Sequence, residues 1–332
     1  MVATTSPTVT PLKDPALKPN YQEAAPEPEA ATGLACDTDA QKRCDAQYDE
    51  KAAMYDSFRF DAPGWGVLSP ILDEIKGKRV LDMGCGTGAF LEKLIDKEPS
   101  TLDGSDTSEK MIVKAQERVD KIKAAGGSLV PKVWAGDTSK VADGAYDVVI
   151  CLQVLQNLTD VVEECVDLRV GFCKEINRIL APGGLAVITT RYRKQPGTDP
   201  ICEGPDASTY GDLYWYADKT VVPKAVNYME FAVPADPVGE LTAAGFTDCA
   251  YHNSPDTVTR SDAYPVGANV LNPAFRAGDS FFSRVVACDE LPALEAHITS
   301  LQESGKLDEY IATRREHAGA LGQVGCLVGR KA

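Results

Sequence analysis

The stretch that decides the fold is Val80-Leu81-Asp82-Met83-Gly84-Cys85-Gly86-Thr87-Gly88-Ala89-Phe90. The apolar run Val80–Met83 predicts a buried strand. The glycines at alternate positions after it permit a tight turn and let the backbone approach a ligand closely. A helix that begins directly after such a turn offers unpaired backbone amides to a bound group. The same letters also fit the dinucleotide pattern G-x-G-x-x-A, so a nicotinamide-dependent oxidoreductase is one alternative.

Two acidic residues, Asp82 and Asp137, separate the two alternatives, and a third is common to both. Asp82 lies inside the strand end, two residues before Gly84, where a carboxylate suits a cationic ligand and would repel a pyrophosphate. Asp106 lies 18 residues after Gly88, near the end of the second predicted strand, and would bind ribose hydroxyls in either case. Asp137 follows the third predicted strand, where it can read an adenine amino group. The pattern therefore favours an adenosyl ligand that carries a positive charge.

Apolar runs and helical patterns alternate from Val80 onward. Further strands are predicted at Val130–Trp134, Val148–Leu152 and Leu185–Thr190 and over 246–252, with helices over 108–125, 173–180 and 237–244. Such alternation predicts a parallel sheet covered by helices on both faces. Two later apolar runs compete for the closing strand, and we favour Val324–Val328, with Phe281–Cys288 as an addition. The segment 291–318 is predicted to be helical.

Composition excludes several classes of function. The chain has 332 residues, 34 basic and 49 acidic, which gives a net charge of −15. This balance argues against nucleic acid as a partner and against an anionic membrane surface. No apolar run is long enough for a membrane helix. Ten cysteines without a C-x-x-C pair, and no clustered histidines, indicate neither a disulfide scaffold nor a metal site, and a reduced cytoplasmic compartment is expected.

The domain boundaries follow from composition. Residues 1–32 carry prolines at every fourth position from Pro7 to Pro19 and few large apolar residues, which predicts a disordered tail. Organelle targeting by this tail stays open as an alternative. Residues 33–332 are predicted to form one domain. Within it, 33–78 supplies N-terminal lid helices, 79–190 the cofactor-binding core, and 191–332 acceptor-side insertions and closing strands.

Five motifs in order resemble the class I S-adenosylmethionine-dependent methyltransferases of the small-molecule type. They are the glycine stretch Leu81–Phe90, then Leu102–Met111, Gly136-Asp137, Tyr146–Leu158 and Glu175–Thr190. The resemblance covers about residues 45–190. It implies a Rossmann-like α/β fold with a seven-stranded sheet in the order 3-2-1-4-5-7-6. We expect an insertion after the fifth strand and a C-terminal helical addition to that fold.

The resemblance also implies the roles of individual residues. Asp82 with Gly84, Gly86 and Gly88 would hold the methionine end of the cofactor. Asp106 would bind the ribose and Asp137 the adenine amine, with Thr107 and Thr138 flanking the ring. A Tyr48-Asp49-x-x-Ala52-x-x-Tyr55-Asp56 stretch resembles the family's lid helix, whose tyrosine faces attract a sulfonium. Gln153, at the end of the fourth strand, completes the predicted cofactor site.

The candidates on the acceptor side are Tyr55, Gln153, Arg191 and His252. Arg191, with Arg193 and Lys194 close behind it, would clamp a carboxylate or phosphate, or else form a solvated positive run. Four aromatic residues would form an apolar acceptor wall, or else cap a small core of the insertion's own; they are Tyr210, Tyr214, Trp215 and Tyr216.

The predicted chemistry is an in-line methyl transfer that yields S-adenosylhomocysteine. Many family members carry a histidine late in the fourth-strand motif, but Asn157 occupies that place here. Without a base, nitrogen, sulfur or acidic oxygen acceptors on a small molecule are favoured. The alternatives are a non-catalytic cofactor-binding partner subunit and a protein methyltransferase, with the oxidoreductase least favoured.

Overall fold

The computed structural model describes residues 48–49, 52–53, 55–57, 68, 71–158, 165–190, 215–226, 234, 236–254, 266–277, 279–314 and 324–332. The chain divides into two units, 1–35 and 36–332, and all described residues belong to the second. The predicted tail 1–32 therefore lies outside the described residues. So do Arg191, Arg193, Lys194, Tyr210 and Tyr214.

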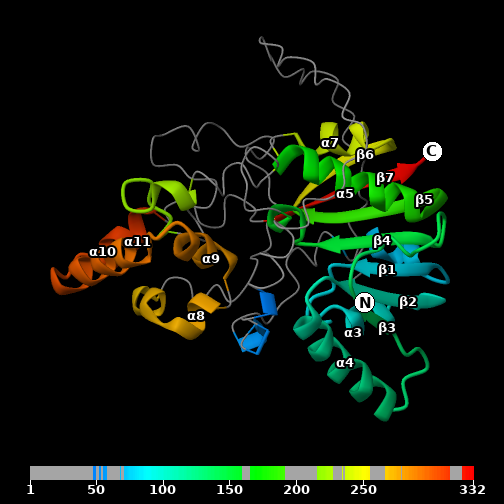
Figure 1. The fold of residues 1–332 in the computed structure, drawn as a ribbon, viewed down its shortest axis with the longest axis horizontal. Coiled ribbons are helices and arrows are strands. Elements are labelled where there is room, and N and C mark those ends of the chain that lie inside the picture. Colours follow the sequence, from blue (N-terminus) through cyan, green and yellow to red (C-terminus); the bar gives the residue numbers. More distant parts are fainter. Residues whose placement is uncertain are drawn as a thin grey trace, which may run out of the picture. The chain divides into compact units, whose positions relative to one another are not determined.

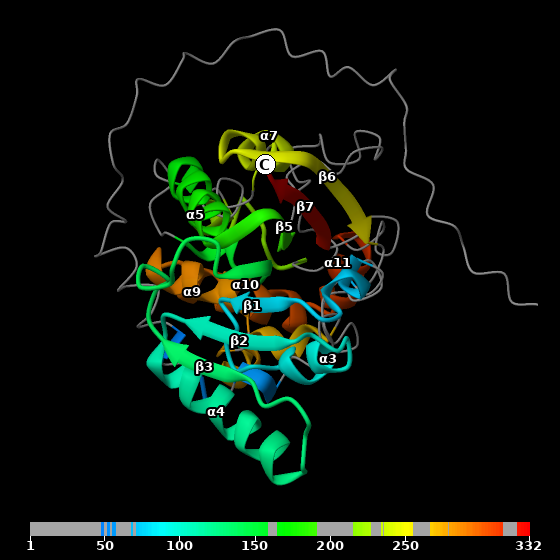
Figure 2. The ribbon, with the colours of Figure 1, turned by 90° about the vertical axis from the view of Figure 1, so that its right-hand side faces the viewer.

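Seven strands form one sheet in the order β3-β2-β1-β4-β5-β7-β6 (Figures 1 and 2). The strands are β1 (Arg79–Met83), β2 (Thr101–Asp106), β3 (Lys132–Ala135), β4 (Tyr146–Leu152), β5 (Leu180–Thr190), β6 (Phe246–Ser254) and β7 (Val324–Lys331). The predicted fold class and strand order are confirmed.

The direction of β7 sets it apart from the other six strands. Neighbours from β3 to β5 pair in parallel, whereas β7 is antiparallel to both β5 and β6. The carboxyl ends of β1, β2, β3, β4 and β5 therefore meet at one edge of the sheet, where open α/β sheets bind ligands. Placing the closing strand at Val324–Val328 is confirmed.

Strand character for Phe281–Cys288 is wrong, because this run forms α9 (Ser280–Ala287). Asp279 caps the helix by accepting a hydrogen bond from the Phe281 amide. Phe281, Phe282 and Val285 are then buried together on one side of the helix. A mainly apolar run of eight residues is too short for its period to distinguish a buried strand from a buried helix, so only the packing decides.

Alternate residues of the central strands enter two different cores. Val80 and Val148 face a core that also contains Leu91 and Leu94 of α3 (Leu91–Ile95) and Val119 of α4. On the other face lies a core formed by α5 (Cys165–Ile179), α7 (Pro237–Ala243) and inward residues such as Leu81 and Val149. This alternation is the period of two that a strand buried on both faces requires. It confirms that helices cover both faces of the sheet.

The helix α4 (Glu109–Ala124) begins at the edge that holds the predicted site. Ser108 is its N-cap and accepts a hydrogen bond from the Met111 amide at 3.2 Å. Met111, Ala115, Val119 and Ile122 are buried at helical spacing, which explains why this segment folds as a helix. The N-terminus of α4 is thereby fixed relative to β2, whose last residue, Asp106, lies two residues before Ser108.

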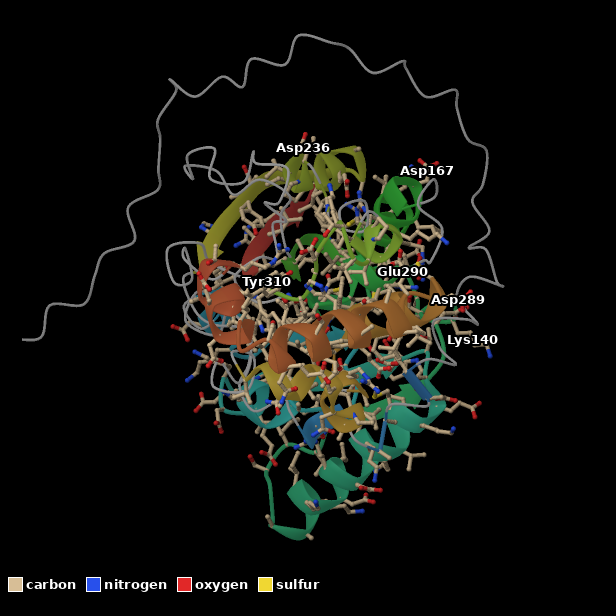
Figure 3. The ribbon with its side chains drawn as sticks, turned by 90° about the vertical axis from the view of Figure 1, so that its left-hand side faces the viewer. Lys140, Asp167, Asp236, Asp289, Glu290 and Tyr310 are labelled. Carbon is tan, nitrogen blue, oxygen red and sulfur yellow. The ribbon has the colours of Figure 1, made fainter. Side chains whose placement is uncertain are left out.

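Helices inserted between β6 and β7 form a helical group with a core of its own (Figure 1). They are η6 (Gly267–Leu271), α8 (Pro273–Ala277), α9, α10 (Leu291–Glu303) and α11 (Leu307–Arg314). Glu290 caps the segment at 223–226 by accepting from two backbone amides, while Tyr310 on α11 donates to Asp218 at 2.6 Å (Figure 3).

Candidate functional site

The glycine loop after β1 is held against the end of β2. The amides of Gly84 and Cys85 both donate to the Ser105 carbonyl, at 2.7 and 2.9 Å. Gly84 has a φ of +82°, and a Cβ there would lie 2.3 Å from Val154 Cγ2. Only glycine fits this position, because the backbone is left-handed and Val154, in the turn after β4, packs directly on it. The loop thus lies between the ends of β2 and β4.

Gly86 faces open space at the centre of the loop. Its φ is +55°, and a Cβ at this position would meet no described atom within 4 Å. The next residue, Thr87, is buried. Gly86 therefore provides a stretch of bare backbone that a flat or extended ligand can approach.

Asp106 is fixed by two backbone amides. Its Oδ2 accepts from the Gly86 amide at 2.8 Å and its Oδ1 from the Ser108 amide at 2.9 Å. The carboxylate consequently ties the glycine loop to the start of α4, at the position expected for ribose recognition. Thr107 is half-buried between Asp106 and the helix cap.

Asp82 is the most unusual group at this edge. Its side chain is 1% exposed, and neither carboxylate oxygen has a hydrogen-bond partner among the described residues. Burial, and secondarily the negative charge of Asp106, raises the pKa of Asp82 to about 7. A buried carboxylate without a partner is costly, and an incoming ammonium group would relieve that cost. This position fits a cationic ligand and does not fit a pyrophosphate.

Asp137 and Thr138 follow β3 and differ in what they offer. Asp137 is exposed and accepts at Oδ1 from the amide and hydroxyl of Ser139, which lowers the pKa of Asp137. Thr138 is buried, and its hydroxyl donates to Glu175 at 2.7 Å. The Thr138 hydroxyl is therefore bound to Glu175 on α5, while the Asp137 carboxylate is an ionised hydrogen-bond acceptor at the surface.

Two carboxylates of the predicted lid, Asp49 and Asp56, bind residues of the predicted cofactor-binding segment 79–190. Asp49 accepts from the Ser108 hydroxyl at 2.6 Å and from the Lys110 amide at 3.1 Å. Asp56, in η1 (Tyr55–Ser57), accepts from the Thr87 hydroxyl at 2.8 Å and pairs with Arg118 of α4 at 2.7 Å. The adjacent residues, Tyr48 and Tyr55, pack edge to face. The predicted lid thus contacts the glycine loop and the α4 N-terminus.

Gln153 follows β4 in a strained conformation. Its φ is +62°, which is uncommon for a residue with a side chain, and its amide donates to both the carbonyl and hydroxyl oxygens of Thr189. Gln156 and Asn157 donate side-chain amides back to the Gln153 carbonyl. The turn after β4 is therefore a cluster of neutral amides at the place where the family often has a histidine.

The remaining acceptor-side candidates do not all come together. His252 lies near the end of β6, three strands from β4, opposite Cys326. Trp215 and Tyr216 are fully buried in the core of the helical group, so the core they join is shared with the helices between β6 and β7 and is not the insertion's own. Arg191 lies outside the described residues. Cys85, Cys151 and Cys173 are buried, and burial raises the pKa of each thiol.

Sequence reasoning missed the residues that hold the site together. Asp49 and Asp56 were recognised only as letters of a lid motif, and Arg118 and Glu175 were not singled out at all. The repeat of Tyr-Asp seven residues apart in this motif was the one available signal for the two carboxylates. Their partners lie 31 to 62 residues away in sequence, beyond the range of any local pattern.

Replacing Gly86 by Ala tests whether the open space above the loop holds a ligand. A left-handed alanine costs about 1 kcal/mol of stability. We expect affinity for S-adenosylhomocysteine to fall at least about tenfold, because the new Cβ fills the ligand's approach. Gly77→Ala is the matched control: its φ is +71°, its Cβ position is equally open, and it precedes β1 at the opposite edge. Equal loss of calorimetric affinity in both variants would contradict the assignment.

Replacing Asp56 by Asn tests the tie between the lid and the loop. The variant loses the ion pair to Arg118 and keeps only a weaker acceptor for Thr87. We expect affinity for S-adenosylhomocysteine to fall about fivefold, equivalent to about 1 kcal/mol for a partly exposed pair. Glu117→Gln removes an exposed ion pair within α4 and should leave the affinity unchanged. Identical affinities of both variants in a calorimetric titration would show that the tie plays no part in binding.

Comparison with known proteins identifies the class that this geometry defines. The methyltransferase-domain family profile matches residues 81–188, which run from the glycine loop to β5. A solved structure described as a methyltransferase from an antibiotic biosynthesis pathway of Anabaena variabilis shares the fold, with a TM-score of 0.54 at 14% identity. The match covers 81% of this chain and 98% of that one. The chain thus carries a methyltransferase domain of the class I fold, and S-adenosylmethionine is the cofactor of that class, as expected.

Two curated relatives resemble the same region. A ubiquinone biosynthesis O-methyltransferase of Mesorhizobium japonicum is 32% identical over 126 residues, which is 35% of this chain and 48% of that protein. A tRNA U34 carboxymethyltransferase of Campylobacter jejuni is 28% identical over 111 residues, 33% of this chain and 37% of that protein. The chain therefore spans less than half the length of these relatives.

In the part of the chain that the structure describes, no helix has the length and apolar character needed to cross a membrane. Nor do three or more histidine, cysteine, aspartate or glutamate side chains gather there as metal ligands would.

Proposed function

We propose that this protein is an S-adenosylmethionine-dependent methyltransferase that acts on a small-molecule nitrogen, sulfur or oxygen acceptor. The observation that carries the cofactor assignment is Asp82, a buried carboxylate without a described partner beside the open backbone of Gly86. An α-ammonium group is the cation that a methionine moiety brings to such a position. In this proposal Asp106, at the end of β2, binds the ribose of the same ligand, and Asp137, after β3, binds its adenine.

The strand order also disfavours the dinucleotide alternative. In the doubly wound dinucleotide fold the sheet has the order 3-2-1-4-5-6. Here the antiparallel β7 is inserted between β5 and β6. Together with an uncompensated carboxylate where a pyrophosphate would lie, this leaves the nicotinamide-dependent oxidoreductase without support.

The chain's own residues supply alignment more than acid–base chemistry. Bound S-adenosylmethionine carries a methyl group that is already activated by a positive sulfur. The glycine loop, Asp82 and Asp106 would fix the cofactor end, so that an acceptor lone pair can attack the methyl carbon in line with the breaking C–S bond. The described residues of the turn after β4 offer only amides, which can orient an acceptor but cannot remove its proton. Acceptors that are unprotonated near neutral pH are therefore favoured.

Charge supports a small acceptor over RNA. The net charge of −15 opposes a polyanion, although one relative is named for tRNA. A basic polypeptide acceptor is compatible with the same charge and stays an alternative. A non-catalytic, cofactor-binding subunit is a second candidate, favoured by the amide cluster of Gln153, Gln156 and Asn157 where a base would be expected.

One experiment distinguishes these functions. Purified protein is first titrated with S-adenosylhomocysteine, NAD(H) and NADP(H), and only the first should raise the melting temperature. The protein is then incubated with methyl-labelled S-adenosylmethionine and a cell extract separated into metabolite, protein and nucleic-acid fractions. Label in the metabolite fraction supports the proposal, and label in protein or RNA alone overturns the small-molecule assignment. Binding without label in any fraction supports the non-catalytic subunit.

A further inference from the structure

A single arginine on α5 holds the connection between β3 and β4. Arg178 Nη1 donates to the Val141 carbonyl at 2.8 Å and to the Asp143 carboxylate, and Nη2 donates to the Thr138 carbonyl at 3.0 Å. Both carbonyls belong to a connection that has no strand neighbour of its own. The guanidinium therefore replaces the hydrogen bonds that a sheet would have supplied to this backbone.

Glu175, one helical turn before Arg178, orients the guanidinium. Glu175 accepts from Arg178 Nε at 2.8 Å and Nη2 at 2.7 Å, a bidentate geometry that fixes the plane of the fork. The same carboxylate accepts the Thr138 hydroxyl at 2.7 Å. The hydrogen bond from Arg178 is the main cause that lowers the pKa of Glu175, so this residue stays ionised. We call Glu175 and Arg178 the α5 brace.

The α5 brace acts next to the residue expected to recognise the adenine. Asp137 immediately precedes Thr138, whose carbonyl and hydroxyl are both held by the brace. On its other side, the amide of Gly136 donates to the Asp106 carbonyl at 2.9 Å, and Gly136 has a φ of +110°. The backbone before Asp137 is thus held to the end of β2 through Gly136, and the backbone after it is held to the α5 brace through Thr138. Lys140, in the same connection, is labelled in Figure 3.

We propose that Arg178, oriented by Glu175, is a positioning residue that aims Asp137 at the 6-amino group of the cofactor's adenine and so sets the preference for that base. The Gly136 amide holds one side of this turn to Asp106, and the Val141 amide donates to the Thr138 carbonyl at 2.8 Å, so Arg178 is the contact that ties the turn as a whole to α5. Without the fork, the Asp137 carboxylate keeps its charge and its bonds to Ser139, but the turn that carries it loses this tie to α5. This inference rests on the proposed function, because it presupposes that an adenosyl cofactor binds here.

The test compares two ligands that differ only at the base. S-adenosylhomocysteine carries the 6-amino group, and S-inosylhomocysteine carries an oxo group that cannot donate to Asp137. We expect the wild-type protein to prefer the amino ligand by at least about tenfold in calorimetric titrations. Arg178→Gln and Asp137→Asn should each reduce this preference about tenfold, chiefly by weakening the amino ligand. The double variant should lose no more than either single variant, because both changes remove the same interaction.

Controls separate positioning from general weakening. Arg330→Gln is matched, since Arg330 also joins a carboxylate, Glu74, to a backbone carbonyl, that of Gly183, but it lies on β7. Its ligand preference should equal that of the wild type. If Arg178→Gln does not fold, Glu175→Gln gives the same comparison, because it releases the fork and keeps the guanidinium.

Three results would overturn the inference. They are an equal loss of affinity for both ligands in the Arg178 variant, a preference unchanged by Asp137→Asn, and additive effects in the double variant. A wild-type protein that does not bind S-adenosylhomocysteine would instead contradict the proposed function itself, which makes the two failures distinguishable.

Discussion

Replacing Asp82 by Asn is expected to make the cofactor-free protein more stable and at the same time to abolish most of its cofactor affinity. The buried carboxylate has a folded-state pKa of about 7, raised by burial from its ordinary value of 3.8. Below about pH 4 this group is protonated in both the folded and the unfolded protein, and the folded state is then at its most stable with respect to this group. As the pH rises from there to about 7, the unfolded state ionises more readily than the folded state, so the free energy of unfolding falls. At pH 8 the substitution should therefore stabilise the protein by up to about 4 kcal/mol.

The loss of affinity has the same origin. A cationic ammonium group needs the ionised carboxylate, and Asn offers only a neutral oxygen. We expect affinity for S-adenosylhomocysteine to fall by about 1.5–3 kcal/mol, which is roughly tenfold to more than a hundredfold. In the wild type the affinity should rise as the pH increases up to about 7 and then level off, whereas in Asp82→Asn it should show no such rise.

Asp106→Asn provides the contrast. Its carboxylate oxygens accept from two backbone amides, so an amide side chain would put a donor against a donor. Both stability and affinity should fall in that variant. Thermal melting from pH 4 to 8 together with calorimetric titration measures all these quantities. If Asp82→Asn melts below the wild type at pH 8, the carboxylate has a partner in the free protein and its assignment is wrong.

Breaking the buried ion pair between α5 and α7 should produce the largest loss of stability. Arg169, 2% exposed, donates to Glu240 in a bidentate manner, at 2.7 Å from Nε and 2.6 Å from Nη2. Removing one partner leaves the other charge in the core without the bidentate pair that helps to offset its desolvation. We expect Glu240→Gln or Arg169→Met to cost about 3–5 kcal/mol in the free energy of unfolding, measured by denaturant titration.

The double variant Arg169→Met with Glu240→Leu should be much closer to the wild type. It removes both charges at once and replaces them with apolar side chains of similar length, so no buried charge is left uncompensated. Lys114→Gln, which breaks the exposed pair to Glu117, should leave stability within error. A double variant as unstable as the single variants would mean that Arg169 contributes through packing and not through its charge.

The helical group illustrates where prediction from sequence failed. Phe281–Cys288 is short, apolar except for Ser283 and Arg284, and followed by Asp289-Glu290, so its sequence supports a strand as well as a helix. Helix α9 forms because Phe281, Phe282 and Val285 meet Tyr216 and Phe275 from other segments. Tertiary packing overrides local propensity here, and no local window contains those partners.

In the lid and the site, too, motifs predict the positions of residues along the chain, whereas their contacts are known only from the structure. The motif letters placed Asp82, Asp106 and Asp137 at the ends of three strands, and the structure puts all three at the carboxyl edge of the sheet. Their individual states could not be read from the motif. Asp106 is held by two amides, Asp82 has no partner among the described residues, and Thr138, directly after Asp137, is held by Arg178 from 40 residues further on.

Local pattern predicts the class of fold, because period and glycine turns are properties of neighbouring residues and can be recognised without the rest of the chain. The strand order and the cofactor expected at the strand ends follow from the resemblance that the five motifs carry to class I methyltransferases. The pairing of charges, in contrast, becomes visible only in the tertiary structure. Arg178 meets Thr138 across 40 positions and Arg169 meets Glu240 across 71, and such contacts exist only once the sheet has brought distant segments together.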